Sequence, residues 1–264
     1  MGKKIAIIGG GNLGTAIAEG LLKSKFSKAS ELTVTKRNTN TLKDLNEKGI
    51  NVTSDNSAAV KKNEVIILAV KPYQVAEVLS GIKKDLTKEK ILISVVTGVL
   101  ISEMEEVFKT DIPVFRAMPN TAIAIQESMT CICSQYANAD QVKYVNDLFN
   151  RLGKVVTIDE KLMEAATILA ACGTAYAMRY IRANIQGGIE IGFDAATASL
   201  ISAQTVKGAA ELLLQKGSHP EQEIDKVTTP KGCTIAGLNE MEHRGFSSSL
   251  IRGVVVSYKK IERS

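Results

Sequence analysis

The first part of the chain alternates short apolar runs with longer amphipathic segments. The runs are rich in β-branched residues, and each has the length of a single strand. They are Ile5–Ile8, Leu32–Thr35, Val65–Val70, Ile91–Val96, Val114–Ala117 and Val155–Ile158. The run Val65–Val70 is apolar at every position, as expected for a parallel strand that helices cover on both faces. This pattern predicts an α/β fold with a doubly wound parallel sheet.

Beyond residue 159 the pattern changes to long, alanine-rich segments without strand signals. We expect helices over residues 161–191, 194–216, 232–243 and 247–263. Apolar residues surround most of the circumference of the segment 195–214, which is more than one small helical domain can bury. The sequence therefore predicts two domains, with the sheet in residues 1–159 and an all-helical domain in residues 160–264. The helical domain is expected to form a homodimer or a higher homo-oligomer.

The composition is that of an ordinary globular protein and excludes several classes of partner. Apolar residues make up 45% of the chain, the net charge is +5, and the basic residues are scattered. There is no Trp and no interleaving of basic with aromatic residues, so we expect no nucleic acid partner. The modest positive charge favours an anionic small molecule instead. With no signal peptide and no apolar run long enough to cross a bilayer, we expect a cytoplasmic protein without a membrane partner.

The cysteines and histidines show no metal-binding pattern. Cys131, Cys133, Cys172 and Cys233 lack CxxC spacing, and the two histidines stand apart from other ligand types. We therefore predict no metal site, and thiols rather than disulfides in a reducing compartment.

A glycine-rich segment directly follows the first predicted strand. It reads Gly9-Gly10-Gly11-Asn12-Leu13-Gly14 and leads into a helical pattern. In this position Gly9 permits a tight turn, Gly11 lets the backbone approach a pyrophosphate, and Gly14 lets the helix pack closely on the strand. The unpaired amides of Asn12 and Leu13 would face the anion at the helix N-terminus. The segment predicts a dinucleotide site in a Rossmann domain.

The residues after the second predicted strand indicate which dinucleotide binds. An NAD site has an acidic residue there, about 20 residues beyond the glycine motif, to bind the ribose hydroxyls. This chain has Lys36-Arg37-Asn38-Thr39 instead, and the guanidinium of Arg37 suits a 2′-phosphate. The alternative is a solvated charged turn. We expect NADPH as cofactor, with NADH as a weaker one.

Several further segments resemble one family, the pyrroline-5-carboxylate reductases. With the glycine motif, they span nearly the whole chain: Asp55-Asn56, Ala69-Val70-Lys71-Pro72, Arg116-Ala117-Met118-Pro119-Asn120-Thr121, and Thr229 to Leu238. The resemblance implies the NAD(P)H-dependent reduction of the cyclic imine 1-pyrroline-5-carboxylate to L-proline.

The resemblance also implies which residues bind the cofactor. Asn56 would bind the adenosine ribose, and Ala69, Val70, Lys71 and Pro72 would border the cofactor near its nicotinamide end. Thr97, in the turn after the fourth predicted strand, would face the nicotinamide. We interpret these positions as the C-terminal ends of strands, where open α/β sheets bind their ligands.

For the substrate, the resemblance points to the start of a predicted helix. The amides of Gly232, Cys233 and Thr234 would hold the carboxylate. The Thr234 hydroxyl would meet the ring nitrogen as the catalytic contact, and Glu160 would lie near the same site. Taken alone, Thr234 and Glu160 also fit ordinary polar residues at helix starts. Because the imine carbon is already electrophilic, we expect catalysis mainly by positioning.

The chain departs from the family pattern around the substrate. Ala170-Ala171-Cys172-Gly173-Thr174-Ala175-Tyr176 stands where the family has Ser-Gly-Ser-Gly-Pro-Ala-Tyr, Lys231 replaces a Gly, Thr97 an Ala and Ala122 a Pro. Lys231 either distorts the carboxylate pocket or strengthens it. Three alternatives follow: a non-catalytic NADP-binding relative, a reductase of a related imine or carboxylate, and a β-hydroxyacid dehydrogenase. The last needs a lysine on the long helix after the sheet, and no Lys occurs between Leu162 and Val206.

Overall fold

A computed structural model describes residues 2–261 and divides the chain into two compact units. The first unit runs to Cys172 and takes in Lys260 and Ile261. The second unit is Gly173–Lys259. The sequence placed a domain boundary between residues 159 and 160, and that boundary stays a prediction.

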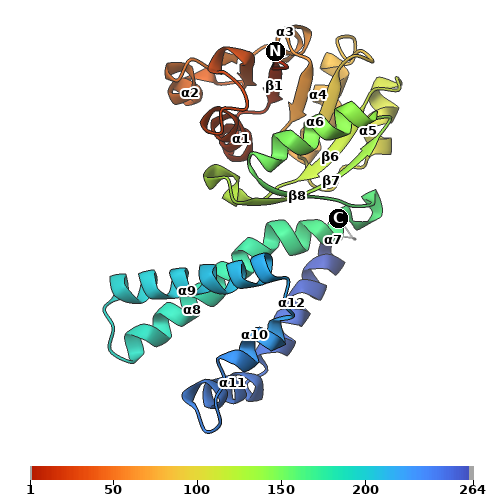
Figure 1. Cartoon of the computed structure of the whole chain (residues 1–264). Helices are drawn as coiled ribbons and strands as arrows, with labels where there is room; N and C mark the ends of the chain where they lie inside the picture. The colour runs from red at the N-terminus through yellow and green to blue at the C-terminus, as the bar shows by residue number, and fades with distance from the viewer. Residues whose placement is uncertain (1, 262–264) are drawn as a thin grey trace. The chain divides into compact units, whose positions relative to one another are not determined.

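The first unit is built on an eight-stranded sheet with the order β3-β2-β1-β4-β5-β6-β7-β8 (Figure 1). The first six strands in this order, from β3 through β2, β1, β4 and β5 to β6, are parallel to their neighbours. Strand β7 runs antiparallel to β6, and β8 is parallel to β7. The strands are β1 (Ile5–Ile8), β2 (Leu32–Thr35), β3 (Asn51–Thr53), β4 (Val65–Leu68), β5 (Ile91–Ser94), β6 (Val114–Met118), β7 (Ser128–Gln135) and β8 (Gly153–Thr157). The doubly wound sheet predicted from the sequence is confirmed.

Helices cover both faces of this sheet. They are α1 (Asn12–Lys23), α2 (Lys43–Glu47), α3 (Asn56–Lys62), α4 (Val75–Ile82), α5 (Ile101–Phe108), α6 (Ala139–Asn150) and α7 (Met163–Ala166). Helices α1, α2 and α6 pack with Ile5 and Ile7 in one buried cluster. Helices α3, α4, α5 and α7 pack with Ala6 and Ile8 in the other. Adjacent residues of β1 thus belong to opposite cores, because side chains alternate between the faces of a strand.

The sequence did not predict two of the strands, β3 and β7. The prediction that all strands are parallel was wrong at β7, which runs antiparallel to β6. β3 has only three residues and begins with an exposed Asn, so it carries little strand signal. β7 includes Ser, Thr and Gln among its eight residues. Only nine residues separate the end of β6 from the start of β7, and they include the short 3₁₀-helix Thr121–Ile125. A parallel crossover needs about a dozen residues or more, so this connection favours antiparallel pairing.

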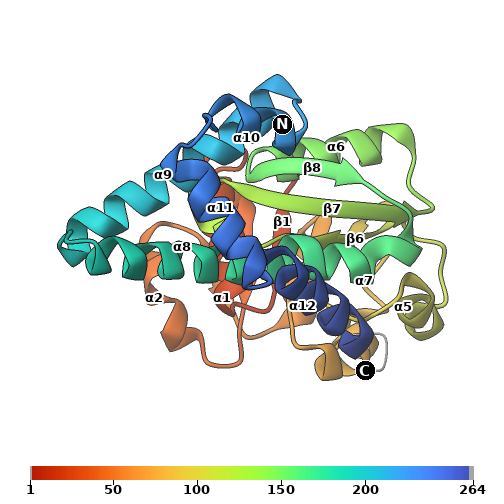
Figure 2. The ribbon, with the colours of Figure 1, turned by 90° about the horizontal axis from the view of Figure 1, so that it is seen from below.

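The second unit consists of helices α8 (Gly173–Glu190), α9 (Ala195–Lys216), α10 (Pro220–Lys226), α11 (Cys233–His243) and α12 (Phe246–Ile261) up to Lys259. Helices α8 and α9 lie side by side (Figure 1; Figure 2). The hydroxyl of Tyr176 on α8 donates to Ser257 Oγ on α12 at 2.7 Å. Helix α10 was missed, although Pro220 follows the N-cap His219. The predicted end of the last helix at Arg263 lies outside the described residues.

The long helix expected over residues 161–191 is not continuous. A 3₁₀ turn (Glu160–Leu162), α7 and a π-helix (Thr167–Cys172) precede α8. Wider π-helical turns are often found at functional positions. Here the π-helix ends where the first unit ends.

The helical unit leaves most of its apolar side chains exposed. Among its described residues, only Ala198 and Ser202 are buried. Large exposed apolar side chains occur on α8, α9 and α12, including Met178, Ile189, Leu200, Leu214, Leu250, Ile251 and Val256. A surface of this kind is typical of an interface. Over the described residues, no helix combines the length and apolarity needed to span a bilayer.

Candidate functional site

The predicted cofactor residues follow neighbouring parallel strands of the first unit. Gly9 follows β1, Arg37 follows β2, Asn56 comes after β3, Ala69 follows β4 and Thr97 comes after β5. These strands are adjacent in the order β3-β2-β1-β4-β5, so their carboxyl ends share one edge of the sheet. The chain crosses from one side to the other between β1 and β4, and open α/β sheets bind ligands at such a point.

The glycine turn has the geometry of an open backbone cradle. Gly9 has φ +113°, and a Cβ there would lie 2.4 Å from the carbonyl oxygen of Ala69. A Cβ on Gly14 would lie 2.1 Å from the carbonyl oxygen of Gly9. Gly11 differs, because a Cβ there would meet nothing within 4 Å. It is the N-cap of α1 and supplies no side-chain cap, so the first turn of α1 presents amides and positive dipole to this space. These features fit a pyrophosphate.

Arg37 and Asn56 lie at the carboxyl ends of β2 and β3. The Arg37 side chain is 83% exposed, and its guanidinium is 3.9 Å from the Glu77 carboxylate, which is also exposed. Such an exposed contact is weak and leaves the guanidinium accessible to a phosphate. Asn56 is the first residue of α3, whose N-terminus is capped by Asp55 Oδ1 through a 2.9 Å bond from the Ala58 amide. The two residues thus follow adjacent strands at one edge of the sheet.

The segment after β4 turns sharply at the same edge. The Ala69 amide donates to the carbonyl of Ile8 on β1 at 2.8 Å, which ties the end of β4 to the glycine turn. Val70 is half-buried, whereas Lys71 and Pro72 are exposed. The Lys71 amide donates to Gln74 Oε1 at 3.2 Å, and Lys71 itself caps a short 3₁₀-helix, Pro72–Gln74.

Thr97 and Gly98 form the turn between β5 and α5. The Thr97 hydroxyl is 3.9 Å from Met118 Sδ, at the end of β6, as donor to the sulfur. Gly98 has φ +73°, which favours glycine. The hydroxyl of Thr97 is therefore directed at the protein's own β6 strand.

Glu160 belongs to an ion cluster that the sequence did not predict. Its Oε1 atom accepts a bond from Arg116 Nη1 and another from the Ile101 amide, both at 2.9 Å. Arg116 Nη2 also donates to Glu164 Oε1 at 3.0 Å. The Arg116 side chain is only 2% exposed, so both carboxylates compensate a buried charge. The cluster joins β6, α5 and α7.

The field of this cluster reaches the thiol that pairs with Arg116 across the sheet. Cys133 on β7 is opposite Arg116. Burial, with the nearby Glu160 carboxylate, raises the pKa of the Cys133 thiol to about 11. Burial similarly raises the pKa of the Glu105 carboxyl on α5, with further contributions from Asp111 and Glu160. Cys133 is therefore a neutral core residue at physiological pH.

The sequence contained one signal for this cluster. Arg116 interrupts the apolar run Val114-Phe115-Arg116-Ala117-Met118, and every residue of that strand is buried. An arginine on a buried strand requires a carboxylate partner. The sequence could not show that Glu160 and Glu164 are the partners, because they are more than 40 positions away.

The predicted substrate residues start helix α11 in the second unit. Gly232 is the N-cap of α11, and a Cβ there would lie 2.5 Å from Thr229 Oγ1. The Gly232 amide donates to the carbonyl of Thr229 at 2.9 Å, so the turn itself uses it. The amides of Cys233 and Thr234 begin the helix beyond that turn. Cys233 is exposed and Thr234 is half-buried. These three residues thus lie together, in a different unit from Glu160.

Lys231 is strained in the same turn. It has φ +61°, a left-handed conformation that favours glycine, and it follows Pro230 in a tight turn from Thr229 to Gly232. The glycine that the family has at this position would adopt this conformation without strain.

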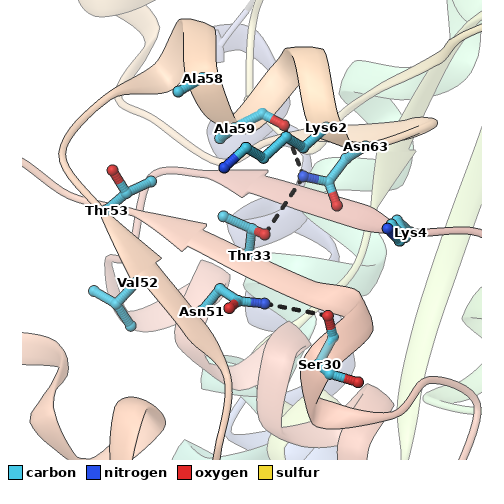
Figure 3. Close-up of a pocket in the computed structure, with 10 residues that line it drawn as sticks. All are labelled: Lys4, Ser30, Thr33, Asn51, Val52, Thr53, Ala58, Ala59, Lys62 and Asn63. Carbon is cyan, nitrogen blue, oxygen red and sulfur yellow. Dashed lines mark hydrogen bonds between the residues drawn. The ribbon is translucent and has the colours of Figure 1, made fainter.

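A polar hollow of about 460 Å³ lies along β2, β3 and α3 (Figure 3). Its lining residues include Lys4, which precedes β1, and Asn51, which begins β3, so much of it lies toward the amino ends of the strands. The side-chain amide of Asn51 donates to Ser30 O, and that of Asn63 donates to Ala59 O. Lys4, Ser30 and Asn51 lie before or at the start of their strands, at the edge of the sheet opposite the candidate cofactor site.

Comparisons with known proteins match both parts of the chain. A family model described as "Pyrroline-5-carboxylate reductase dimerisation" matches residues 160–264, and one described as "NADP oxidoreductase coenzyme F420-dependent" matches residues 4–98. Pyrroline-5-carboxylate reductase 2 of Dictyostelium discoideum is 44% identical, over 99% of this chain and 93% of that protein. The chain belongs to the pyrroline-5-carboxylate reductase family.

Two further members of the pyrroline-5-carboxylate reductase family illustrate the match. Pyrroline-5-carboxylate reductase 1 of Dictyostelium discoideum is 46% identical over 97% of this chain, which spans about half (49%) of that protein's length. The crystal structure of the Plasmodium falciparum enzyme with NADP bound has a TM-score of 0.88 and 30% identity, covering 99% of this chain and 97% of that one. The resemblance to this family is confirmed, and the β-hydroxyacid dehydrogenase alternative is set aside.

Proposed function

We propose that this chain reduces 1-pyrroline-5-carboxylate to L-proline with NADPH. The observation that carries the proposal is the 44% identity, over nearly the full length of both chains, to a pyrroline-5-carboxylate reductase. The open glycine turn, the exposed Arg37 and the absence of an acidic residue directly after β2 support the choice of cofactor. The bound NADP in the Plasmodium falciparum structure is consistent with it.

In this proposal, Gly9, Gly11, Asn12, Leu13 and Gly14 bind the pyrophosphate through backbone groups. Arg37 binds the 2′-phosphate and Asn56 the adenosine ribose. Ala69 to Pro72 and Thr97 border the nicotinamide end. The shared sheet edge supports these assignments.

When bound, NADPH would supply the hydride for the imine carbon, and the ring nitrogen would take up a proton to become the amine of proline. The task of the protein is to hold the two reactants in line. The amides of Cys233 and Thr234 would hold the substrate carboxylate, aided by the dipole of α11. The Thr234 hydroxyl would hydrogen-bond the ring nitrogen. Because the Gly232 amide bonds to Thr229, Gly232 contributes through close packing of the turn.

We further propose that the chain forms homo-oligomers through its helical unit. The match to a dimerisation family over residues 160–264 supports this, as do the exposed apolar side chains of α8, α9 and α12. A second copy would cover these side chains and remove them from water. The predicted cytoplasmic location stays a prediction that cell fractionation would test.

Steady-state oxidation of NADPH in the presence of pyrroline-5-carboxylate tests the proposed function. We expect turnover that requires both reactants and yields proline. Tight NADPH binding without turnover would favour the non-catalytic relative. Turnover of other cyclic imines or imino acids in preference to pyrroline-5-carboxylate would favour the related reductase.

A further inference from the structure

Arg116 holds a position on β6 from which it reaches two other elements of the first unit. It shares one face of the strand with Val114 and Met118, and all three are buried. Its guanidinium bonds Glu160, the first residue of the 3₁₀ turn after β8, and Glu164 in α7. Arg116 Nε is buried without a partner among the described residues. The cluster is thus costly to bury and incompletely paired, which suggests a role beyond stability.

Glu160 carries the contact onward to α5. The same Oε1 atom that meets Arg116 Nη1 accepts the amide of Ile101, the first residue of α5. That amide is one of the helix donors that have no partner within the helix. A second carboxylate, Glu103, accepts the preceding amide of Leu100 at 2.7 Å. The start of α5 is thereby fixed both to its own helix and to β6.

The segment between β5 and α5 is fixed at both of its ends. At one end, the Val95 amide donates to the carbonyl of Leu68 on β4 at 3.0 Å. At the other end, Glu160 holds Ile101. Between them, the Thr97 hydroxyl meets Met118, two residues beyond Arg116 on the same face of β6. The conformation of the Thr97–Gly98 turn therefore depends on β6 through two side chains.

We infer that Arg116 is a positioning residue for the nicotinamide end of the cofactor site. It acts through Glu160, which sets the start of α5 and so the place of the Thr97–Gly98 turn. This inference rests on the proposed function, since the proposal puts the nicotinamide beside Thr97. In this inference Glu160 fixes the start of α5 and does not need to contact the substrate.

Variants of Glu160 and Glu164 test the inference, because removing Arg116 would leave two carboxylates uncompensated and confound folding with positioning. Glu160→Gln keeps an acceptor oxygen for both donors and loses only the charge. Glu160→Ala removes the acceptor. Glu164→Gln is the matched control, since it weakens the other ion pair of Arg116 and does not touch Ile101.

The first readout is amide hydrogen exchange of the cofactor-free protein over residues 96–104. We expect faster exchange of the Ile101 amide in Glu160→Ala, and near wild-type exchange in Glu160→Gln and Glu164→Gln.

The second readout is the steady-state kinetics of pyrroline-5-carboxylate reduction. Glu160→Ala should lower kcat about 10- to 100-fold, as a misplaced reactant does. Its KM for pyrroline-5-carboxylate should stay within about twofold of wild type. The isotope effect with NADPH deuterated at the transferred position should rise, and Glu160→Gln should restore most of kcat.

Other results would overturn the inference. If Glu160→Gln is as damaging as Glu160→Ala and both act on the KM for substrate, Glu160 contacts the substrate directly. If Glu160→Ala matches wild type in kcat and in exchange at Ile101, the cluster is structural only. A wild-type chain that binds NADPH and does not reduce pyrroline-5-carboxylate overturns the proposed function, and the inference with it.

Discussion

Gly14 lies so close to Gly9 that a Cβ on Gly14 would be 2.1 Å from the Gly9 carbonyl oxygen. No rotation of a side chain can relieve this contact, because the opposing atom is backbone. Gly14→Ala should therefore push α1 away from β1 and lower the free energy of unfolding by about 3 kcal/mol. Chemical denaturation of the cofactor-free protein would measure this loss.

Gly11→Ala is the matched variant in the same turn. Gly11 has φ −83° and ψ −171°, which alanine adopts readily, and a Cβ there meets nothing within 4 Å. Stability should be unchanged, whereas NADPH affinity should fall at least about tenfold, because the methyl group occupies the space proposed for the pyrophosphate. A fluorescence titration with NADPH decides this. Unchanged affinity would place the pyrophosphate elsewhere.

Arg37→Asp should reverse the preference from NADPH toward NADH. The change removes the proposed partner of the 2′-phosphate and adds an acceptor for the ribose hydroxyls. A charge-assisted hydrogen bond contributes about 1.5–3 kcal/mol, so NADPH affinity should fall about 10- to 100-fold. Arg37→Ala should lose NADPH affinity to a similar extent without gaining NADH affinity. Equal NADPH affinity in wild type and Arg37→Asp would remove Arg37 from the site.

Thr234→Val removes one hydroxyl and nearly keeps the shape of the side chain. Folding and NADPH binding should persist, while kcat/KM should fall about five- to hundredfold, as expected for one lost hydrogen bond of roughly 1–3 kcal/mol. Thr234→Ser restores the hydroxyl and should recover most of the rate. Reduction of pyrroline-5-carboxylate by Thr234→Val at the wild-type rate would show that the hydroxyl has no catalytic role.

Lys231→Gly should stabilise the protein despite the greater freedom of glycine in the unfolded chain. The left-handed backbone of Lys231 destabilises the folded state by about 1–2 kcal/mol. Glycine removes this strain, but its greater freedom in the unfolded chain offsets about 0.5–1 kcal/mol of the gain. We expect a net gain of about 0.5 kcal/mol. Lys231→Ala keeps the strain and should give no such gain. The KM for pyrroline-5-carboxylate decides whether Lys231 strengthens or distorts the carboxylate pocket. A higher KM in both variants would show that the ammonium group binds the carboxylate, and a lower KM would show that the lysine distorts the pocket.

The buried thiol of Cys133 should make stability depend on alkaline pH. Its pKa is raised from 9.0 to about 11, so the neutral form is favoured in the folded state. Below pH 9 the thiol is neutral in both states and its contribution is fully present; it is lost as the pH rises through about 11. Denaturant midpoints measured across this range should fall with pH. Cys133→Ala removes the titrating group, so its midpoint should fall less steeply.

Local pattern determined a large part of this structure. The apolar runs became β1, β2, β4, β5, β6 and β8, because strand formation and burial follow from the spacing of apolar residues. The glycine motif specified its own turn, since Gly9 and Gly14 meet conditions that no other residue satisfies. The absence of an acidic residue after β2 and the alanine-rich helices could also be recognised from the sequence. The short edge strand β3 and the polar β7 were not, because tertiary pairing rather than their own sequence makes them strands.

Tertiary structure alone decided what the side chains of the site do. The sequence could not show that the Ile101 amide donates to Glu160, 59 positions away, or that Glu160 pairs with Arg116. The sequence supplied one charged residue on a buried strand and several acidic residues elsewhere, and only folding selects which acid compensates it. Likewise, Lys231 is an ordinary lysine in sequence and becomes a strained one through the turn that Pro230 and Gly232 impose. Local periodicity encodes the elements, whereas buried charges and backbone strain depend on contacts between residues that are distant in sequence or fixed by a turn.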